Sequence, residues 1–115
     1  MSNTIIYGIK NCDTVKKALA WLEERGVVFT FHDYKKQGVD EDVLRRALDQ
    51  HGWENVINRR GTTWRQLPGD VKEAMDAKRA IDIALENPSI IKRPLLVHDD
   101  EIHLGFKDEL YSRIF

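Results

Sequence analysis

The apolar positions at the start of the chain change their spacing after the first few residues. Residues 4–7 form a β-branched and aromatic run, which is typical of a buried strand, and Gly8 ends it. A polar turn follows, after which apolar residues recur at i, i+3, i+4 and i+7, the stripe of an amphipathic helix. The members of that stripe are Val15, Ala18, Leu19 and Leu22. The pattern therefore predicts a strand, a turn and a helix in close succession.

A second strand is predicted directly after this helix. Gly26 is suited to end the helix, and in residues 27–34 two phenylalanines alternate with Val28, Thr30 and His32. A helical crossover between two strands implies that the strands are parallel. We expect residues 35–38 to form a loop.

The middle of the chain reads as helical. Asp40 is a candidate N-cap for a helix that Gly52 closes, and Asp76 is a candidate N-cap for a second helix that Asn87 and Pro88 stop. Residues 53–69 have weak periodicity. Within them, residues 58–64 carry two adjacent arginines beside a glycine, and we expect a loop there that leads to a short turn of helix.

The last third predicts a hairpin and a closing helix. Residues 95–97 and 101–104 read as strands around a turn at 98–100, and residues 107–115 carry helical spacing. The order βαβ, helical block, ββα is the thioredoxin arrangement, an α/β fold with one four-stranded mixed sheet. We expect a single domain over residues 1–115, in which 1–34 and 88–115 form the two halves and 35–87 a helical insertion.

Pro94 precedes the predicted third strand. In the thioredoxin arrangement, a cis Arg93–Pro94 bond would turn the backbone at residue 93 toward the turn that contains Cys12. The alternative is an ordinary trans proline at the start of a strand.

Composition narrows the class of protein. With 115 residues, 42% hydrophobic and 32% charged, and a net charge of -1, the chain reads as a globular domain without the basic excess expected for nucleic-acid binding. No stretch approaches the roughly 20 apolar residues of a membrane span, and no signal peptide is evident. The single cysteine suits a reducing compartment, so we expect a cytoplasmic monomer. The histidines show no ligand pairing, and we expect no bound metal and no tightly bound cofactor.

Cys12 is placed where cysteines become nucleophiles. It lies in the polar turn before the first helix, whose unpaired N–H groups and dipole favour a thiolate, and Lys10, Lys16 and Lys17 add positive charge. The alternative is a small buried hydrophobe, but Cys12 lies outside the apolar stripe.

Several segments together resemble the arsenate reductase and Spx-like family of the thioredoxin-like superfamily, in particular its YffB-type branch. They are residues 10–17, 58–64, 86–95 and 104–106. The resemblance implies a thioredoxin-like fold with a helical insertion and a thiol-based redox reaction at Cys12. It also implies that Lys16 is the basic residue of the cysteine's helix and that Arg93 and Arg60 bind an anion, with Arg59 as the alternative to Arg60.

The chain departs from the family's patterns at two positions. Glutaredoxin-coupled arsenate reductases place an arginine about where this chain has Phe106, and an aromatic ring cannot donate hydrogen bonds to an oxyanion. Spx-type regulators often carry a C-x-x-C switch, whose second position here is Val15. An intramolecular disulfide switch is therefore excluded.

These features predict a glutathione-dependent thiol reductase. Cys12 would attack an oxidised thiol or disulfide substrate, and glutathione, as cosubstrate, would resolve the mixed disulfide. The two carboxylates of glutathione would pair with a cationic rim made of Lys10, Arg60, Lys92, Arg93 and Lys107. The alternative is that the basic pairs at 59–60 and 92–93 are only solvated charges on loops. The predicted binding residues are Lys10, Asn11, Thr14, Lys16, Arg60, Arg93 and Pro94. Asn11 and Thr14 are equally suited to be helix caps.

Two other functions stay open on the sequence. The first is arsenate reduction coupled to glutaredoxin, with arsenate held on Cys12. The second is a non-catalytic regulator that binds RNA polymerase, as Spx-type proteins do. Neither nucleic acid nor a membrane is an expected partner.

Overall fold

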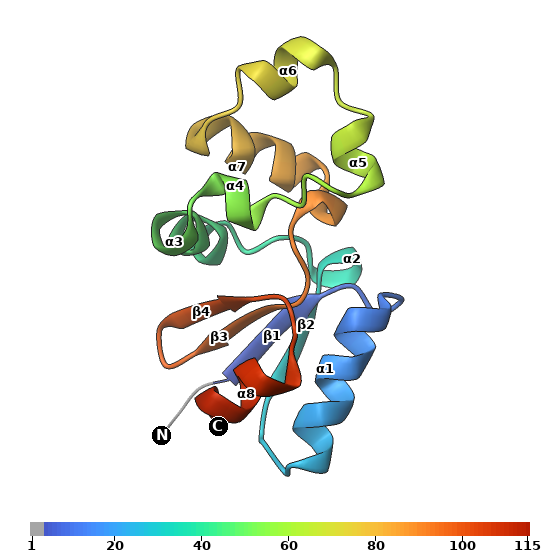
Figure 1. The fold of residues 1–115 in the computed structure, drawn as a ribbon, viewed down its shortest axis with the longest axis vertical. Helices are drawn as coiled ribbons and strands as arrows, with labels where there is room; N and C mark the ends of the chain where they lie inside the picture. Colours follow the sequence, from blue (N-terminus) through green and yellow to red (C-terminus); the bar gives the residue numbers. More distant parts are fainter. Residues whose placement is uncertain (1–3) are drawn as a thin grey trace. The chain divides into compact units, whose positions relative to one another are not determined.

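The computed structural model describes residues 4–115 and divides the chain into two compact units (Figure 1). The sheet unit comprises the chain up to Gln37 together with Arg93–Phe115, and the helical unit is Gly38–Lys92. The expected insertion, 35–87, overlaps the helical unit but has different bounds. The short helix α2, Tyr34–Gln37, contacts strand β2, and the 3₁₀ turn η1, Pro88–Ile90, contacts helix α7, so each belongs with its neighbour.

The sheet unit contains one four-stranded mixed sheet in the order β2-β1-β3-β4. Its strands are β1 (Thr4–Gly8), β2 (Thr30–Asp33), β3 (Leu95–His98) and β4 (Glu101–Leu104). Strand β1 is parallel to β2 and antiparallel to β3, and β4 is antiparallel to β3. This is the thioredoxin-like arrangement predicted from the order of elements.

Two helices cover one face of this sheet. They are α1 (Asp13–Glu24) and α8 (Asp108–Ile114), and their buried side chains meet Ile6 of β1 and Leu96 of β3, which are cross-strand partners. Helix α1 contributes its predicted apolar stripe. Trp21 of α1 donates a hydrogen bond from Nε1 to Asp108 at 2.8 Å, which ties the start of α8 to α1.

The prediction for residues 27–38 is wrong at both ends. Strand β2 begins only at Thr30, and Val28 is 90% exposed, so the apolar alternation before Thr30 does not report burial. Residue 34 begins α2 where a strand end and a loop were expected. Asp33 explains the change, because its side chain accepts the N–H of Lys35 at 2.9 Å and so favours a helical turn over further extension.

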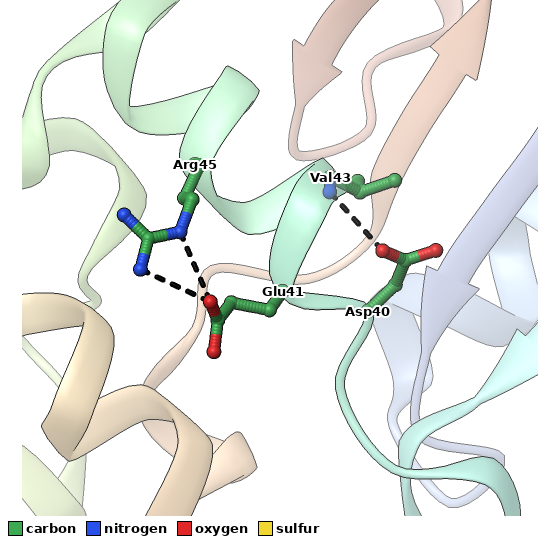
Figure 2. A network of polar contacts seen from close by, with 4 residues as sticks. All are labelled: Asp40, Glu41, Val43 and Arg45. Carbon is green, nitrogen blue, oxygen red and sulfur yellow. Dashed lines mark hydrogen bonds and ion pairs between the residues drawn. The ribbon is translucent and has the colours of Figure 1, made fainter.

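The two long helices of the helical unit begin at the predicted caps. Helix α3 is Glu41–His51, and Figure 2 shows Asp40 accepting the N–H of Val43 at 3.3 Å and a contact of 3.0 Å between Glu41 and Arg45. Helix α7 is Ala77–Glu86, and its cap, Asp76, accepts the N–H of Arg79 at 2.8 Å. In each helix, one of the unpaired N-terminal N–H groups is therefore satisfied by a side chain that the sequence identifies.

Short helices occupy the segment between α3 and α7, in which the sequence predicted a loop and a short turn of helix over residues 58–64. They are α4 (Trp53–Val56), α5 (Thr62–Arg65) and α6 (Gly69–Glu73). The expected turn of helix is confirmed by α5, whereas α4 and α6 lie outside residues 58–64 and were not predicted. A helix of a single turn contains too few apolar positions to show a period, so the pattern does not distinguish it from a loop.

Two absences hold for residues 4–115. None of the helices in this part of the chain is long and apolar enough to cross a membrane. The same residues contain no group of three or more histidine, cysteine, aspartate or glutamate side chains that could hold a metal ion.

Gly8 allows the close approach of β1 and α1. A Cβ atom added at Gly8 would lie 2.8 Å from Cγ2 of Val15, a β-branched side chain with little rotamer freedom. We predict that Gly8→Ala lowers the free energy of unfolding by about 1–3 kcal/mol, the usual cost of overpacking, in denaturant titrations. Gly69→Ala is the control, because no atom lies within 4 Å of the added Cβ. Equal effects of the two substitutions would contradict the steric argument.

The Tyr111 hydroxyl is buried without a hydrogen-bond partner among the residues that the structure describes. Burial also raises the pKa of Tyr111 far above its usual value. We predict that Tyr111→Phe, which removes the unsatisfied hydroxyl and keeps the ring, raises the free energy of unfolding by about 1 kcal/mol. Tyr111→Leu, which removes the edge-on ring contacts with Trp21 and Phe106, is expected to destabilise the fold. A loss of stability in Tyr111→Phe would show that the hydroxyl is hydrogen-bonded.

Candidate active site

Cys12 lies at the junction between β1 and α1. Its N–H donates to the carbonyl of Ile9 at 3.2 Å, which closes the turn after the strand, and its carbonyl accepts the first helical hydrogen bond, from Lys16, at 2.9 Å. Cys12 is the N-cap residue of α1, with extended backbone angles. Its side chain is partly exposed, so a substrate can reach the sulfur while the helix N-terminus lies next to it.

Arg93 is the cation that the fold brings to this sulfur. The antiparallel register pairs Tyr7 at the end of β1 with Leu95 at the start of β3, so Arg93 and the turn after β1 lie at the same edge of the sheet. The Arg93–Pro94 bond is cis, as expected from the fold, and the carbonyl of Pro94 accepts the N–H of Gly105 at 2.8 Å. Arg93 is within hydrogen-bonding reach of the Cys12 sulfur.

Opposing effects act on the Cys12 thiol, and the net result is a lowered pKa. Partial burial, the largest single effect, raises the pKa, whereas the N–H of Val15, a hydrogen bond from Arg93, the N–H of Thr14 and the charge of Arg93 lower it. The neutral thiol does not act as a capping side chain, so these donors favour the charged form in particular. The site therefore stabilises a thiolate, the nucleophilic form of cysteine.

The other residues predicted in the turn and in α1 are exposed. Lys10, Asn11, Thr14 and Lys16 all lie at the surface around the start of α1. Since Cys12 is itself the N-cap, neither Asn11 nor Thr14 caps the helix, and that interpretation is wrong. The backbone N–H of Thr14, rather than its hydroxyl, is what acts on the sulfur.

Arg60 belongs to the helical unit. It is exposed in a turn in which its N–H donates to Oδ1 of Asn58 at 3.2 Å. Arg59 lies over the ring of Trp53, with 5.7 Å between its guanidinium carbon and the ring centroid. The assignment of Arg60 or Arg59 to the Cys12 site stays a prediction.

Phe106 takes part in packing. It is half-buried and meets Tyr111 edge-on, with ring centroids 4.7 Å apart and an interplanar angle of 86°. Its side chain has no polar atom, so this position contributes to the core around α8 and offers no donor to an anion.

Comparison with known proteins identifies relatives along nearly the whole chain. The profile of the ArsC family matches residues 7–114. An uncharacterized protein of Haemophilus influenzae is 44% identical over 110 residues, which cover 96% of each chain. The global transcriptional regulator Spx of Streptococcus mutans is 29% identical over 101 residues, which cover 86% of this chain and 73% of Spx.

Solved structures of similar proteins share the fold. A protein described as YFFB is 46% identical and has a TM-score of 0.92, with 96% of this chain and 97% of the other chain covered. An arsenate reductase (ArsC) related protein from Brucella melitensis is 50% identical and has a TM-score of 0.77, with coverages of 96% and 92%. Both the sequence and the fold are therefore similar to those of this group over almost the full length.

The hydrogen bond and the charge of Arg93 can be separated by substitution. We predict that the pH midpoint of Cys12 alkylation by iodoacetamide lies below the ordinary cysteine value of about 8.5 and moves to higher pH in Arg93→Met. The sign follows because removing a group that stabilises the thiolate raises the thiol pKa. Arg93→Lys, which keeps the charge without the planar fork, is expected to fall between the two.

Lys17→Met is the matched control for this measurement. It also removes one positive charge from the neighbourhood of α1, but Lys17 is not among the groups that lower the Cys12 pKa. Its alkylation profile should match that of the unmodified chain. Equal shifts in Lys17→Met and Arg93→Met would mean that general charge, and not the Arg93 contact, controls the thiol.

Proposed function

Because the chain belongs to the ArsC family, we propose that it is a thiol–disulfide reductase in which Cys12 is the nucleophile and glutathione supplies the resolving thiol. The observation that carries the proposal is the contact between Cys12 and Arg93 at the N-terminus of α1. The lowered pKa increases the fraction of Cys12 that is a thiolate and so available for attack, whereas a structural cysteine gains nothing from these donors.

The proposed reaction consists of two thiol–disulfide exchanges. In the first, the Cys12 thiolate attacks one sulfur of the substrate disulfide; a Cys12–substrate disulfide forms, and the other half leaves as a thiolate that takes up a proton. In the second, the glutathione thiolate attacks the substrate sulfur of that mixed disulfide and releases Cys12 as a thiolate. The second product is a disulfide between glutathione and the attacked half of the substrate. The donors around Cys12 stabilise it as the leaving group of this step.

An external resolving thiol is required because the chain has one cysteine. Glutathione fits the chemistry of the surroundings, since its carboxylates would meet exposed cations such as Lys10 and Lys16 on the turn and on α1. Arg93 and Pro94 would border the bound thiol from the start of β3. The proposed glutathione-binding residues also include Arg60, and Asn11 and Thr14, which would orient the bound thiol. Glutaredoxin is a further candidate for the protein that resolves the mixed disulfide.

Arsenate reduction is the second candidate, favoured by the similarity to the Brucella melitensis arsenate reductase related protein. It would use the same Cys12 thiolate, with an arsenate oxyanion bound to the sulfur. Phe106 weighs against it, because a ring packed on Tyr111 donates no hydrogen bond to the oxyanion. We therefore rank the exchange of thiols and disulfides above it.

A regulatory function is the third candidate, favoured by the 29% identity to Spx of Streptococcus mutans. It would require binding to RNA polymerase without turnover. The position that completes the C-x-x-C switch of Spx-type proteins is here Val15, which is fully buried, so this chain would lack their disulfide switch.

We predict that Cys12→Ser abolishes glutathione-dependent reduction of a mixed disulfide and brings the rate down to that of the uncatalysed exchange, since the serine hydroxyl cannot form the intermediate. The measurement is oxidised glutathione formed from a glutathionylated peptide, coupled to glutathione reductase. Mass spectrometry of the unmodified chain, quenched during turnover, should detect a single disulfide adduct on Cys12.

Parallel assays separate the three candidates. Activity of the unmodified chain that equals that of Cys12→Ser would refute the proposed reductase. Turnover of arsenate with glutathione and glutaredoxin, in the absence of disulfide reduction, would favour the second candidate. Capture of purified RNA polymerase by a chain without either activity would favour the third.

A further inference from the structure

Helices α3 and α7 contact each other in the helical unit, and side chains of both line a pocket of about 460 Å³. The residues that give the pocket its character are Arg45, Leu48 and Asp49 of α3 and Lys78, Ile81 and Asp82 of α7. Its two basic and two acidic residues leave the lining without a formal net charge. A lining of this kind is complementary to a ligand that itself carries both a positive and a negative group.

The charges have the same spacing on both helices. The basic residue precedes the acidic one by four positions in each case, Arg45 before Asp49 and Lys78 before Asp82. Residues at this spacing lie on one face of a helix, with about 5–6 Å between their Cβ atoms. Each helix therefore presents one cation and one carboxylate to the pocket, a single turn apart.

These charges do not neutralise one another within the protein. The spacing would allow an ion pair along each helix, but the structure forms neither pair. Among residues 4–115, Asp49, Lys78 and Asp82 make no ion pair and no side-chain hydrogen bond. One ammonium group and two carboxylates are thus available to a ligand.

The fourth charged group, the guanidinium of Arg45, is held in place by Glu41. Figure 2 shows the arrangement, in which Nε at 3.1 Å and Nη2 at 3.0 Å both meet the same carboxylate oxygen of Glu41. The other terminal nitrogen, Nη1, takes no part in these two contacts. A guanidinium that is already oriented loses less conformational freedom when it binds a carboxylate of a ligand.

The uncharged part of the lining is apolar. Leu48 and Ile81 are 7% and 8% exposed, so both belong largely to the core of the helical unit and only their edges reach the pocket. Leu85 follows Ile81 by one turn on the same face of α7 and is 36% exposed, which makes it the one exposed large apolar side chain of this unit. An apolar group of a ligand that covers these side chains would remove their surface from water.

We propose that this pocket binds a zwitterion of the size of a dipeptide with apolar side chains. Its ammonium group would lie between Asp49 and Asp82, and its carboxylate would meet Lys78 and Arg45. Because an extended chain spans about 3.3–3.6 Å per residue, the terminal charges of a dipeptide lie about 7 Å apart, a separation similar to that of the charges on each helix. A single amino acid carries both charges on one carbon atom and is too short for this arrangement.

The size of the pocket agrees with such a ligand, since its volume lies in the range of small-molecule sites. None of its lining residues belongs to the proposed glutathione-binding set around Cys12. The site therefore goes beyond the proposed thiol reaction.

The test is a titration of the full-length Cys12→Ser chain, labelled with ¹⁵N, with leucyl-leucine and separately with its N-acetyl form and its C-terminal amide. We expect leucyl-leucine to cause saturable shifts at the backbone amides of Asp49, Lys78, Ile81 and Asp82. The N-acetyl form lacks the ammonium group and the amide form lacks the carboxylate. Each should bind about tenfold more weakly, the usual effect of losing a charge-assisted hydrogen bond.

Substitutions assign the two ends of the ligand. Lys78→Gln should weaken the binding of leucyl-leucine about tenfold and leave that of the amide form unchanged, because the amide form has no carboxylate to lose. Asp82→Asn should likewise weaken the binding of leucyl-leucine and leave that of the N-acetyl form unchanged. This crossed pattern is specific to a zwitterion bound by both ends.

Arg79→Gln is the matched control, because it removes one positive charge from the exposed neighbour of Lys78, which does not line the pocket. Binding in this variant should be unchanged. Shifts that do not saturate, equal binding of leucyl-leucine and its two blocked forms, or equal losses in Arg79→Gln and Lys78→Gln would overturn the proposal. Because the probes contain no sulfur and the chain lacks its thiol, the result is independent of the outcome for the proposed reductase.

Discussion

The antiparallel pairing of β1 with β3 is the constraint on which the candidate active site depends. Strand β1 is central in the sheet, and its end lies beside the start of β3 through the pair Tyr7 and Leu95. The turn that carries Cys12 follows β1, and Arg93 lies two residues before β3. Neither residue is near the other in the sequence, so the register of one strand pair brings the sulfur and the guanidinium together.

The pKa of the Cys12 thiol is lowered because the hydrogen-bond donors and the charge around it outweigh the effect of its partial burial. Partial burial alone would keep the sulfur protonated, because a charge in a less polar environment is costly. The start of α1 provides N–H groups that no helical carbonyl accepts, and Arg93 adds both a hydrogen bond and a charge. Gly8 makes this geometry accessible, since it lets β1 and the first buried residue of α1 approach closely.

Much of the fold could be predicted from the sequence wherever an element is long enough to show a period or is delimited by a residue with a specific role, such as a cap. The stripe of α1, the Asp40 and Asp76 caps and the hairpin turn at Asp99 and Asp100, where φ is positive, all leave local signals. The single-turn helices α4 and α6 leave none. The early strand start was wrong because Val28 alternates with phenylalanines and yet faces solvent.

The same limit applies to the site residues. Cys12 and Pro94 could be predicted because each stands at a defined place in the fold, at a helix start and before a strand. The backbone donors of Val15 and Thr14 follow from the helix start but are not visible as residue types. Arg60 lies in a segment of weak periodicity, where the sequence gives no register; its environment, a pocket that Asn58 and Lys92 also line, emerges only from the isolated β-bridge between Ile57 and Ile91.

Lys92 and Arg93 are consecutive in the chain, yet they belong to different units and have different physical roles. Lys92 lines the same pocket of the helical unit as Arg60, whereas Arg93 acts on the sulfur in the sheet unit. Oxyanion chemistry at Cys12 would need further donors beside Arg93, and the position that provides one in arsenate reductases is here Phe106, packed on Tyr111. An arginine at position 106 would place a charge against the Tyr111 ring and remove an aromatic contact from the core. The difference from arsenate reductases at this position therefore follows from how this fold is packed. A thiolate with one guanidinium is sufficient for thiol–disulfide exchange, in which no multiply charged oxyanion has to be bound.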